Sequence, residues 1–290
     1  MRRLVKARQK INGDDDINTL NAFDRLGEVL CLQGFYLTAE KIHRRTLKPL
    51  SNRLGYEHPH TLSSMANLAM TFWKQGRWKE AEELAVQVAE TKKRVLGQEH
   101  SDTLTSMAHL VSIFWGQGRL KEAEELELQV TETRKRVLGQ EHPDTLISAG
   151  NLVTTLRGQG KWKEAEELEV QVMETRKIIW GQEHPHTLSS MANLAVTFWG
   201  QGRWKEAEEL EVQVVEISKR VLGQEHPDSL FRMSDLAVTW KSQGRDNETL
   251  ALMERCLALR KQKLGLDHPR TKHSLQLLNK WQMENLALNP

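Results

Sequence analysis

The chain has 290 residues, and its 41 Lys and Arg against 39 Asp and Glu leave a formal net charge of +2. This balance excludes nucleic-acid binding driven by bulk positive charge. The two cysteines, Cys31 and Cys256, are too few for a disulfide framework or a cysteine-based zinc site. No apolar run reaches the roughly 18 residues of a membrane helix, and the basic segment 1–10 lacks the apolar core of a signal peptide. We therefore expect a cytoplasmic protein with no membrane and no nucleic-acid partner.

An internal repeat organises the sequence. The motif Gly-x-x-His, preceded by Leu or Trp, recurs at intervals of 42 residues, starting at Leu54, Leu96, Leu138, Trp180, Leu222 and Leu264. Residues 58–84 and 184–210 differ only at Met70/Val196 and Lys74/Gly200. Such similarity indicates recent duplication of one structural unit. A fixed period of this length is typical of stacked repeats rather than of a domain with a single core.

Each repeat is predicted to form two helices. In the repeat that starts at Thr61, apolar residues recur at i, i+3, i+4 and i+7, as on the buried face of a helix. Gly76 ends this first helix, helix A, because glycine adopts the left-handed conformation of a C-cap. The second helix, helix B, is predicted over 78–96, with acidic first turns and a basic last turn that suit the helix dipole. Pro49 falls inside helix B of the first repeat and is expected to kink or end it.

The predicted fold is an all-α, right-handed superhelical solenoid of six antiparallel helix pairs. The pairs occupy residues 19–60, 61–102, 103–144, 145–186, 187–228 and 229–270. Residues 1–18 are interpreted as a truncated helix B that leads into the array. Residues 271–290 are interpreted as a C-terminal capping helix, because polar residues replace apolar ones on its outer face.

The landmark residues resemble those of the tetratricopeptide repeat, as in Asn193-Leu-Ala-x-x-Phe198, Gln201-Gly-Arg-Trp204 and Glu206-Ala-Glu208. The 42-residue period with Leu-Gly-x-x-His-Pro-x-Thr-Leu is similar to the kinesin-light-chain type. The near-identical copies look most like the C-terminal arrays of fungal NLR-like (NB-ARC or other STAND NTPase) proteins. The resemblance covers about residues 19–288.

One departure from the family pattern concerns helix B. Family repeats usually carry an aromatic residue four positions after the helix B alanine. This chain has Ala85, Glu127, Glu169 or Glu211 there, so looser packing between repeats is expected.

No residue set with catalytic or metal-binding chemistry emerges. The six histidines of the repeated motif lie one helix pair apart, whereas zinc ligands converge within ~2 Å of one ion. Each is therefore expected to pack or hydrogen-bond within its own loop. The segment 158–161 does not follow a strand and precedes Trp162, unlike a phosphate loop. Glutamate runs such as 124–127 are interpreted as a solvated face of helix B. We expect no enzyme activity, no cofactor, no metal and no small-molecule substrate.

A second stripe of helix A lies beside the buried one and, by the resemblance, lines a concave groove. The Asn column is Arg25, Asn67, His109, Asn151, Asn193 and Asp235. The Trp column is Cys31, Trp73, Trp115, Arg157, Trp199 and Lys241. Amides can pair with the backbone of an extended peptide, and Trp rings can bury its side chains. Alternatively, the Asn residues cap helices or stay solvated, and the Trp residues belong to the core between repeats.

The predicted peptide-binding residues are Asn67, His109, Asn151, Asn193, Asp235, Trp73, Trp115, Arg157, Trp199 and Lys241. Arg157 and Lys241 add positive charge, which mildly favours an acidic peptide or a C-terminal carboxylate. The tryptophans that begin helix B, Trp78, Trp162 and Trp204, are assigned to the core.

The favoured function is a non-enzymatic scaffold that binds a peptide segment or a partner protein, of unknown identity, through the helix A face. An alternative is a detached recognition array of an NLR-like NTPase system, which the near-identical copies suggest. A kinesin-light-chain cargo adaptor is less favoured, because no heptads precede the first repeat.

Deleting residues 103–144, one whole repeat, should leave a shorter folded array, because each repeat contacts only its neighbours. Deleting 21 residues from the same repeat should not, because one helix then loses its partner. Circular dichroism melting of both variants checks this. Equal melting behaviour of the two deletions would show that the assigned repeat frame is wrong.

Overall fold

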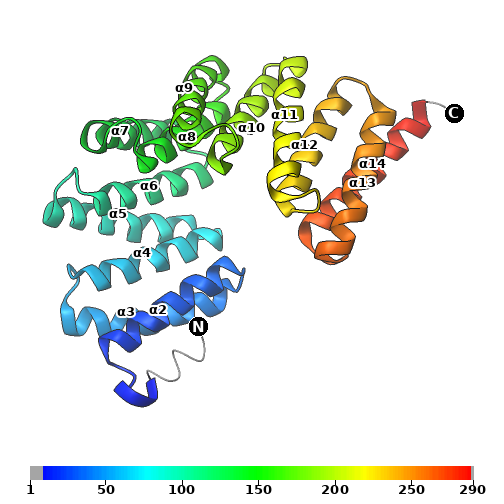
Figure 1. Ribbon diagram of the computed structural model, residues 1–290. Coiled ribbons are helices and arrows are strands. Elements are labelled where there is room, and N and C mark those ends of the chain that lie inside the picture. The colour runs from blue at the N-terminus through cyan, green and yellow to red at the C-terminus, as the bar shows by residue number, and fades with distance from the viewer. Residues whose placement is uncertain (1–8, 289–290) are drawn as a thin grey trace. The chain divides into compact units, whose positions relative to one another are not determined.

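The computed structural model describes residues 9–288, and every regular element among them is a helix (Figure 1). The helices are α2 (Ile17–Leu32), α3 (Tyr36–Leu54), α4 (Pro59–Lys74), α5 (Trp78–Leu96), α6 (Ser101–Gly116), α7 (Leu120–Leu138), α8 (Pro143–Gly158), α9 (Trp162–Trp180), α10 (Pro185–Gly200), α11 (Trp204–Leu222), α12 (Pro227–Ser242), α13 (Asp246–Leu264) and α14 (Pro269–Leu288). Helix starts recur every 42 residues, and α5 has the predicted bounds. The all-α prediction is confirmed. Residues 1–8 of the predicted lead-in lie outside the described part, and residues 9–12 are helical.

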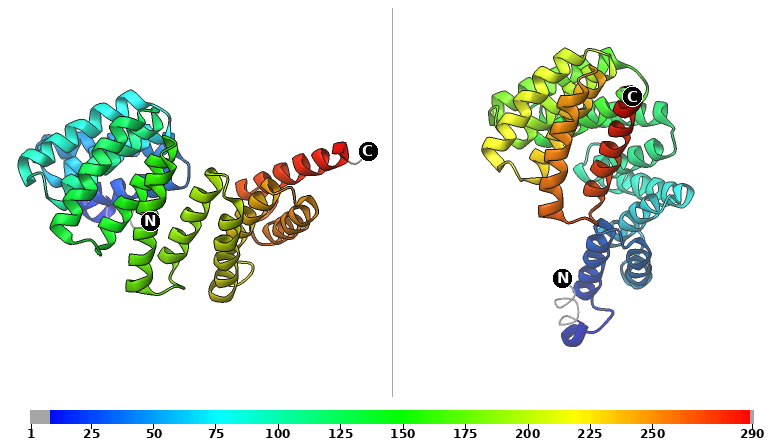
Figure 2. Two further views of the ribbon diagram at one scale, coloured as in Figure 1. Left: turned by 90° about the horizontal axis from the view of Figure 1, so that it is seen from above. Right: turned by 90° about the vertical axis from the view of Figure 1, so that its right-hand side faces the viewer.

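The chain divides into two units, which meet between Thr155 and Leu156 within α8. In unit 1, α2 to α7 pack in chain order, and α4 also contacts α2 and α6. In unit 2, α9 to α14 pack in chain order in the same way. Figure 2 shows the helices from two further sides. Within each unit, successive helix pairs therefore stack so that each covers the apolar face of the next.

The repeated histidines start the helix A elements. The Nδ1 atom of each accepts a hydrogen bond from the backbone N–H two residues later, at 3.1–3.2 Å. This satisfies one of the four N–H groups that a helix start leaves without a partner in the helix. The histidines are His58, His100, His142, His184, His226 and His268. Their expected role within their own loops is confirmed, and it is helix capping.

A glycine turn joins helix A to helix B. After α4, the Arg77 N–H donates to the Phe72 carbonyl at 2.9 Å, and the Gly76 N–H donates to the Trp73 carbonyl at 3.0 Å. These two hydrogen bonds define the Schellman motif, which needs one residue in the left-handed conformation. Gly76 has φ of +75°, and Gly118 has the same value one repeat later. The predicted glycine caps are confirmed.

Small and apolar side chains on helix A and helix B form the core. The alanine at the fourth position of helix B is fully buried in five repeats, at Ala39, Ala81, Ala123, Ala165 and Ala207. A methyl group at this position lets neighbouring helices approach closely. The predicted helix A stripe of the second repeat is also buried, at Met65, Leu68, Ala69 and Phe72.

Pro49 does not end its helix. The helix α3 continues past it to Leu54, although proline removes one backbone donor. Leu50 directly after it is 1% exposed and Ser51 is also buried. Packing of these two residues therefore holds the last turn in place.

Gly118→Val should lower the free energy of unfolding by about 1–3 kcal/mol, because a β-branched residue resists positive φ. A Cβ at Gly118 meets no atom within 4 Å, so the loss reports backbone strain rather than a clash. Urea denaturation measures it. Gly118→Asn is the matched control and should lose much less, because Asn tolerates this conformation. Equal losses for Val and Asn would contradict the assignment.

Candidate binding groove

The Asn column of unit 1 contains one bound amide and one exposed amide. Asn67 is half-buried and donates to Asp24 at 2.7 Å. His109 is half-buried, and burial, with Lys92 nearby, lowers its pKa. Asn151 is exposed. Of these three residues, Asn151 is the exposed one, and its amide also interacts with Glu127.

Asn67 belongs to a buried polar network around Asp24. The carboxylate accepts from His43 Nδ1 at 2.7 Å, from Thr46 at 3.2 Å and from Ser64 at 3.0 Å. Asp24 and His43 are both buried. Removing the Asn67 amide would therefore disturb the core of unit 1 as well as the groove, so Asn67 is a poor position for testing binding alone.

The Trp column of unit 1 borders a pocket of about 320 Å³. Trp115 is 46% exposed, and Trp73 is half-buried with Lys74 Nζ 4.2 Å from its ring centroid. The residues that line the pocket are Trp73, Val111, Ser112, Trp115, Glu127, Asn151, Thr154 and Thr155. Two predicted tryptophans and one predicted asparagine thus meet in one hollow.

Unit 2 holds the remaining predicted residues. Trp199 is 41% exposed, and its indole N–H donates to Ser242 at 2.9 Å. Asn193 is half-buried, and its backbone carbonyl accepts from Arg157 Nη1 at 3.0 Å. Asp235 is half-buried, and burial raises its pKa to about 6.

Lys241 and Arg157 of unit 2 already interact with acidic groups of the chain. Lys241 Nζ lies 2.6 Å from Asp246 and 3.3 Å from Glu284. Arg157 lies beside the carboxyl of Glu169, whose charge opposes the lowering of the Arg157 pKa by burial. The expected attraction of an acidic peptide to Lys241 and Arg157 therefore has no support in unit 2.

The glutamates four positions after the helix B alanine are buried, so their interpretation as part of a solvated face is wrong. Glu127 and Glu169 are 0% exposed, and Glu211 is 6% exposed. Glu125, in the same run, does face solvent. The helix period explains the difference, because Glu127 is one turn after Ala123 on the buried face. The family's aromatic residue at this position was the signal for burial, and the run of acidic residues obscured it.

Burial dominates the electrostatics of these glutamates. Desolvation raises the pKa of Glu127 to about 7, and the nearby Arg134 charge and Asn151 amide oppose this rise. Glu169 and Glu211 also have pKa values of about 7 for the same main reason. Neither carboxyl oxygen of Glu127 or of Glu169 forms a hydrogen bond of ordinary geometry within residues 9–288. The carboxyl groups are therefore partly protonated near neutral pH.

The tryptophans at the start of helix B differ between repeats. A Cβ built on Gly116 would lie 2.6 Å from the Trp78 ring, and one on Gly200 would lie 2.4 Å from the Trp162 ring. These two rings therefore pack directly on the next helix A. Trp204 is 41% exposed, and Ser242 stands at the position equivalent to Gly116 and Gly200. The core assignment is wrong for Trp204.

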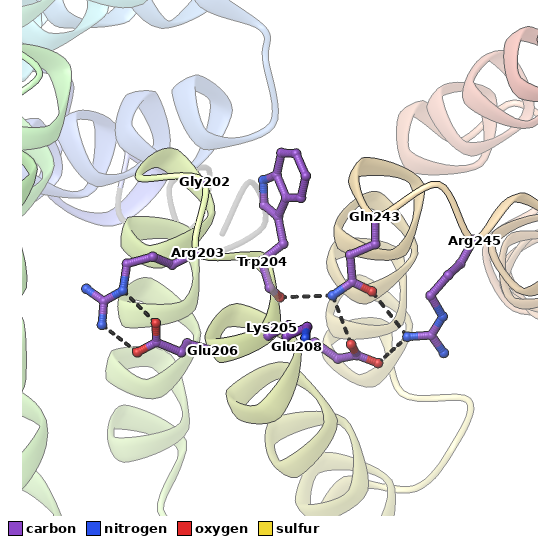
Figure 3. A pocket seen from close by; sticks show the side chains of 8 residues that line it. All are labelled: Gly202, Arg203, Trp204, Lys205, Glu206, Glu208, Gln243 and Arg245. Carbon is purple, nitrogen blue, oxygen red and sulfur yellow. Dashed lines mark hydrogen bonds and ion pairs between the residues drawn. The ribbon is translucent and has the colours of Figure 1, made fainter.

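A hollow of about 720 Å³ in unit 2 lies next to Trp204 (Figure 3). Four of its charged groups form two ion pairs, Arg203 with Glu206 and Arg245 with Glu208, and Arg245 also donates to the neutral Gln243. The hollow is a surface depression around these ion pairs, and Lys205 lines it outside them.

No group of three or more His, Cys, Asp or Glu within residues 9–288 is placed to hold a metal ion. No helix in that range is both long and apolar enough to cross a membrane.

The chain belongs to the tetratricopeptide repeat family. Family models described as tetratricopeptide repeat match residues 15–94, 103–144, 145–186, 187–228 and 232–270. Its repeats are of the kinesin-light-chain type: they are 32% identical to a Podospora anserina structure described as kinesin light chain nearly identical TPR-like repeats. That match covers 70% of this chain and 96% of the other, with a TM-score of 0.63. No curated protein matches the chain.

Two more distant structures share the fold. One is a STAND ATPase with a tetratricopeptide repeat sensor from Pyrococcus horikoshii, 12% identical, covering 92% of this chain and 39% of the other, with a TM-score of 0.68. The other is NprR in complex with its cognate peptide NprX, also 12% identical, covering 98% and 80%, with a TM-score of 0.60.

Glu127→Gln should remove a pH-dependent loss of stability. The pKa of about 7 in the folded chain lies above the ordinary value of 4.5. The contribution of this carboxyl to the free energy of unfolding is therefore fully present below about pH 4.5 and is lost as the pH rises through 7. Between about pH 5 and 8, the free energy of unfolding of the unchanged chain should fall relative to the variant by up to about 3 kcal/mol. Urea denaturation across this range measures the difference.

The control for this prediction is Glu132→Gln, on the exposed side of the same helix α7. Its difference from the unchanged chain should stay constant with pH. If Glu127→Gln also gives a constant difference, then Glu127 titrates at its ordinary pKa and is not buried in solution.

Proposed function

We propose that the protein is a cytoplasmic, non-enzymatic scaffold whose helix A face binds a peptide segment of a partner protein. The observation that carries this proposal is the exposure of Trp115 and Trp199, at 46% and 41%, on that face. Indole rings bury ~150–250 Å² when covered, so leaving two of them open favours a surface that a partner covers.

The polar groups beside the rings support an extended ligand. Asn151 is exposed next to the Trp115 pocket in unit 1, and Asn193 is half-buried in the same column of unit 2. An extended peptide presents unpaired N–H and C=O groups that such amides can satisfy. The structure of NprR, a protein of the same fold, was solved in complex with its cognate peptide, which supports peptide binding by this chain.

A second candidate function is a recognition array of an NLR-like NTPase system, of the fungal type that near-identical copies suggest. The similarity to a STAND ATPase with a tetratricopeptide repeat sensor favours it. An NTPase that co-purifies with the chain, or an adjacent NTPase reading frame, would support this candidate. A cargo-adaptor role, as in kinesin light chains, would instead predict co-purification with a motor subunit.

Asn151→Ala combined with Asn193→Ala should weaken partner binding by about five- to a hundredfold, because each lost hydrogen bond contributes ~0.5–1.5 kcal/mol. A pull-down with mass spectrometry identifies the partner, and calorimetry with the purified partner measures the loss. The melting temperature should change little, because Asn151 is exposed and the Asn193 hydrogen bond to Arg157 uses the backbone carbonyl, which the substitution leaves in place.

The matched control is Glu167→Ala combined with Glu209→Ala, two exposed residues on helix B. It should leave binding unchanged. Glu166 is unsuitable because it bonds Gln201 and Arg203. If the helix B variant loses the partner and the Asn variant keeps it, the opposite face is the interface and the proposal is wrong.

A further inference from the structure

The pocket in unit 1 combines aromatic walls with one buried acid. Trp73 and Trp115 line it from successive A helices, and Glu127 lines it from α7. At about 320 Å³ it is near the lower end of the ~300–1,000 Å³ of small-ligand pockets, a size suited to one side chain. Glu127 is the only ionisable residue among those that line it.

Glu127 has no counter-ion of its own at hydrogen-bond distance within residues 9–288. The positive charge of Arg134 attracts this carboxyl through space, but the Arg134 Nη1 atom donates its hydrogen bond to Ser148 at 2.6 Å. Asn151 approaches from α8 without satisfying either oxygen. Burying a carboxylate without a partner costs free energy. A cation that enters the pocket is therefore attracted by the uncompensated negative charge of Glu127.

In the next repeat along the chain, a basic side chain of the protein itself lies near the equivalent glutamate. Arg157 stands where Trp115 stands one repeat earlier, and Glu169 stands where Glu127 does. In unit 2, Arg157 lies beside the Glu169 carboxyl and bonds the backbone carbonyl of Asn193 at 3.0 Å. A repeat of this type therefore accommodates a guanidinium next to the glutamate at this position of helix B.

We propose that the unit 1 pocket receives a lysine or arginine side chain of the bound peptide, with the Glu127 carboxylate as its counter-charge and the Trp73 and Trp115 rings around its stem. This deepens the proposed function and rests on it for the source of the side chain. Tryptophan faces attract cations, and Lys74 already lies 4.2 Å from the Trp73 ring centroid. Lys74 is exposed, so an entering cation can displace it.

The test uses the full chain labelled with 5-fluorotryptophan, with the signals of Trp73 and Trp115 assigned from Trp→Phe variants. The probes are the Nα-acetyl methylamides of lysine, arginine, norleucine and glutamate, titrated by fluorine NMR. The lysine and arginine probes should shift both signals saturably and bind at least about fivefold more tightly than norleucine. Equal binding of norleucine would make the pocket a purely apolar slot, and binding of glutamate would reverse its charge preference; either result overturns the proposal.

Variants isolate the carboxylate. Glu127→Gln should abolish the preference for lysine over norleucine, and Trp115→Arg should block the probe by placing an internal guanidinium there, as Arg157 does in unit 2. Glu169→Gln, the same change one repeat later, is the matched control and should leave the probe affinity unchanged. Retention of the lysine preference in Glu127→Gln, or no saturable shift with any probe, would also overturn the proposal.

The pH dependence gives a readout that a structural role would not produce. As the carboxyl ionises, its charged fraction rises from about a tenth at pH 6 to about nine-tenths at pH 8, so lysine binding should tighten up to about tenfold. The Glu127→Gln variant should show no such trend.

These titrations need no partner, so failure of the pocket proposal and failure of the proposed function are separate results. A partner can bind the groove without using the pocket, and lysine can fill the pocket while the partner binds elsewhere.

Discussion

An arginine at the turn between helix A and helix B holds consecutive repeats together within each unit. In unit 1, the Arg119 guanidinium bonds Gln117 and Glu122 of its own repeat and Glu82 of the repeat before, and it lies 4.3 Å from the Phe114 ring centroid. The same set recurs around Arg203 in unit 2. One planar group with five donors thus fixes the turn, the aromatic residue at the end of helix A and the preceding helix B.

This fixed register determines what the helix A face can offer. Because the helix pairs of unit 1 stack in a fixed register, Trp73, Trp115 and Asn151 come together in one pocket although they are far apart in the chain. Small differences between the copies then change the local surface. Trp162 packs down over Gly200, whereas Trp204 stays open because Ser242 stands at the equivalent position.

The glutamate in place of the family's aromatic residue changes the chemistry of the interface between repeats. An aromatic ring there would fill the space with carbon, whereas Glu127 and Glu169 bring an ionisable group into it. In unit 2, the nearby charges of Arg157 and Arg176 oppose the rise of the Glu169 pKa. Unit 1 has Trp115 at the position of Arg157, so the charge that opposes the rise of the Glu127 pKa is that of Arg134. The difference between Arg157 and Trp115 at this one helix A position thus places a guanidinium charge near Glu169 in unit 2 and an indole ring in the pocket of Glu127 in unit 1.

The sequence by itself determined the period, the all-helical architecture, the bounds of helix B and the positive φ of the turn glycines, because these depend on interactions within a few residues or on exact repetition. It also predicted Trp73, Trp115 and Asn151 on one face, and these three line one pocket of unit 1. The tertiary structure alone decided the state of each column member: Asn67 is held by Asp24, Lys241 is paired with Asp246 and Glu284, and Glu127 is buried. Each of these depends on a contact with another helix, and a side chain's charge, partner and exposure are set by those contacts rather than by its place in the repeat.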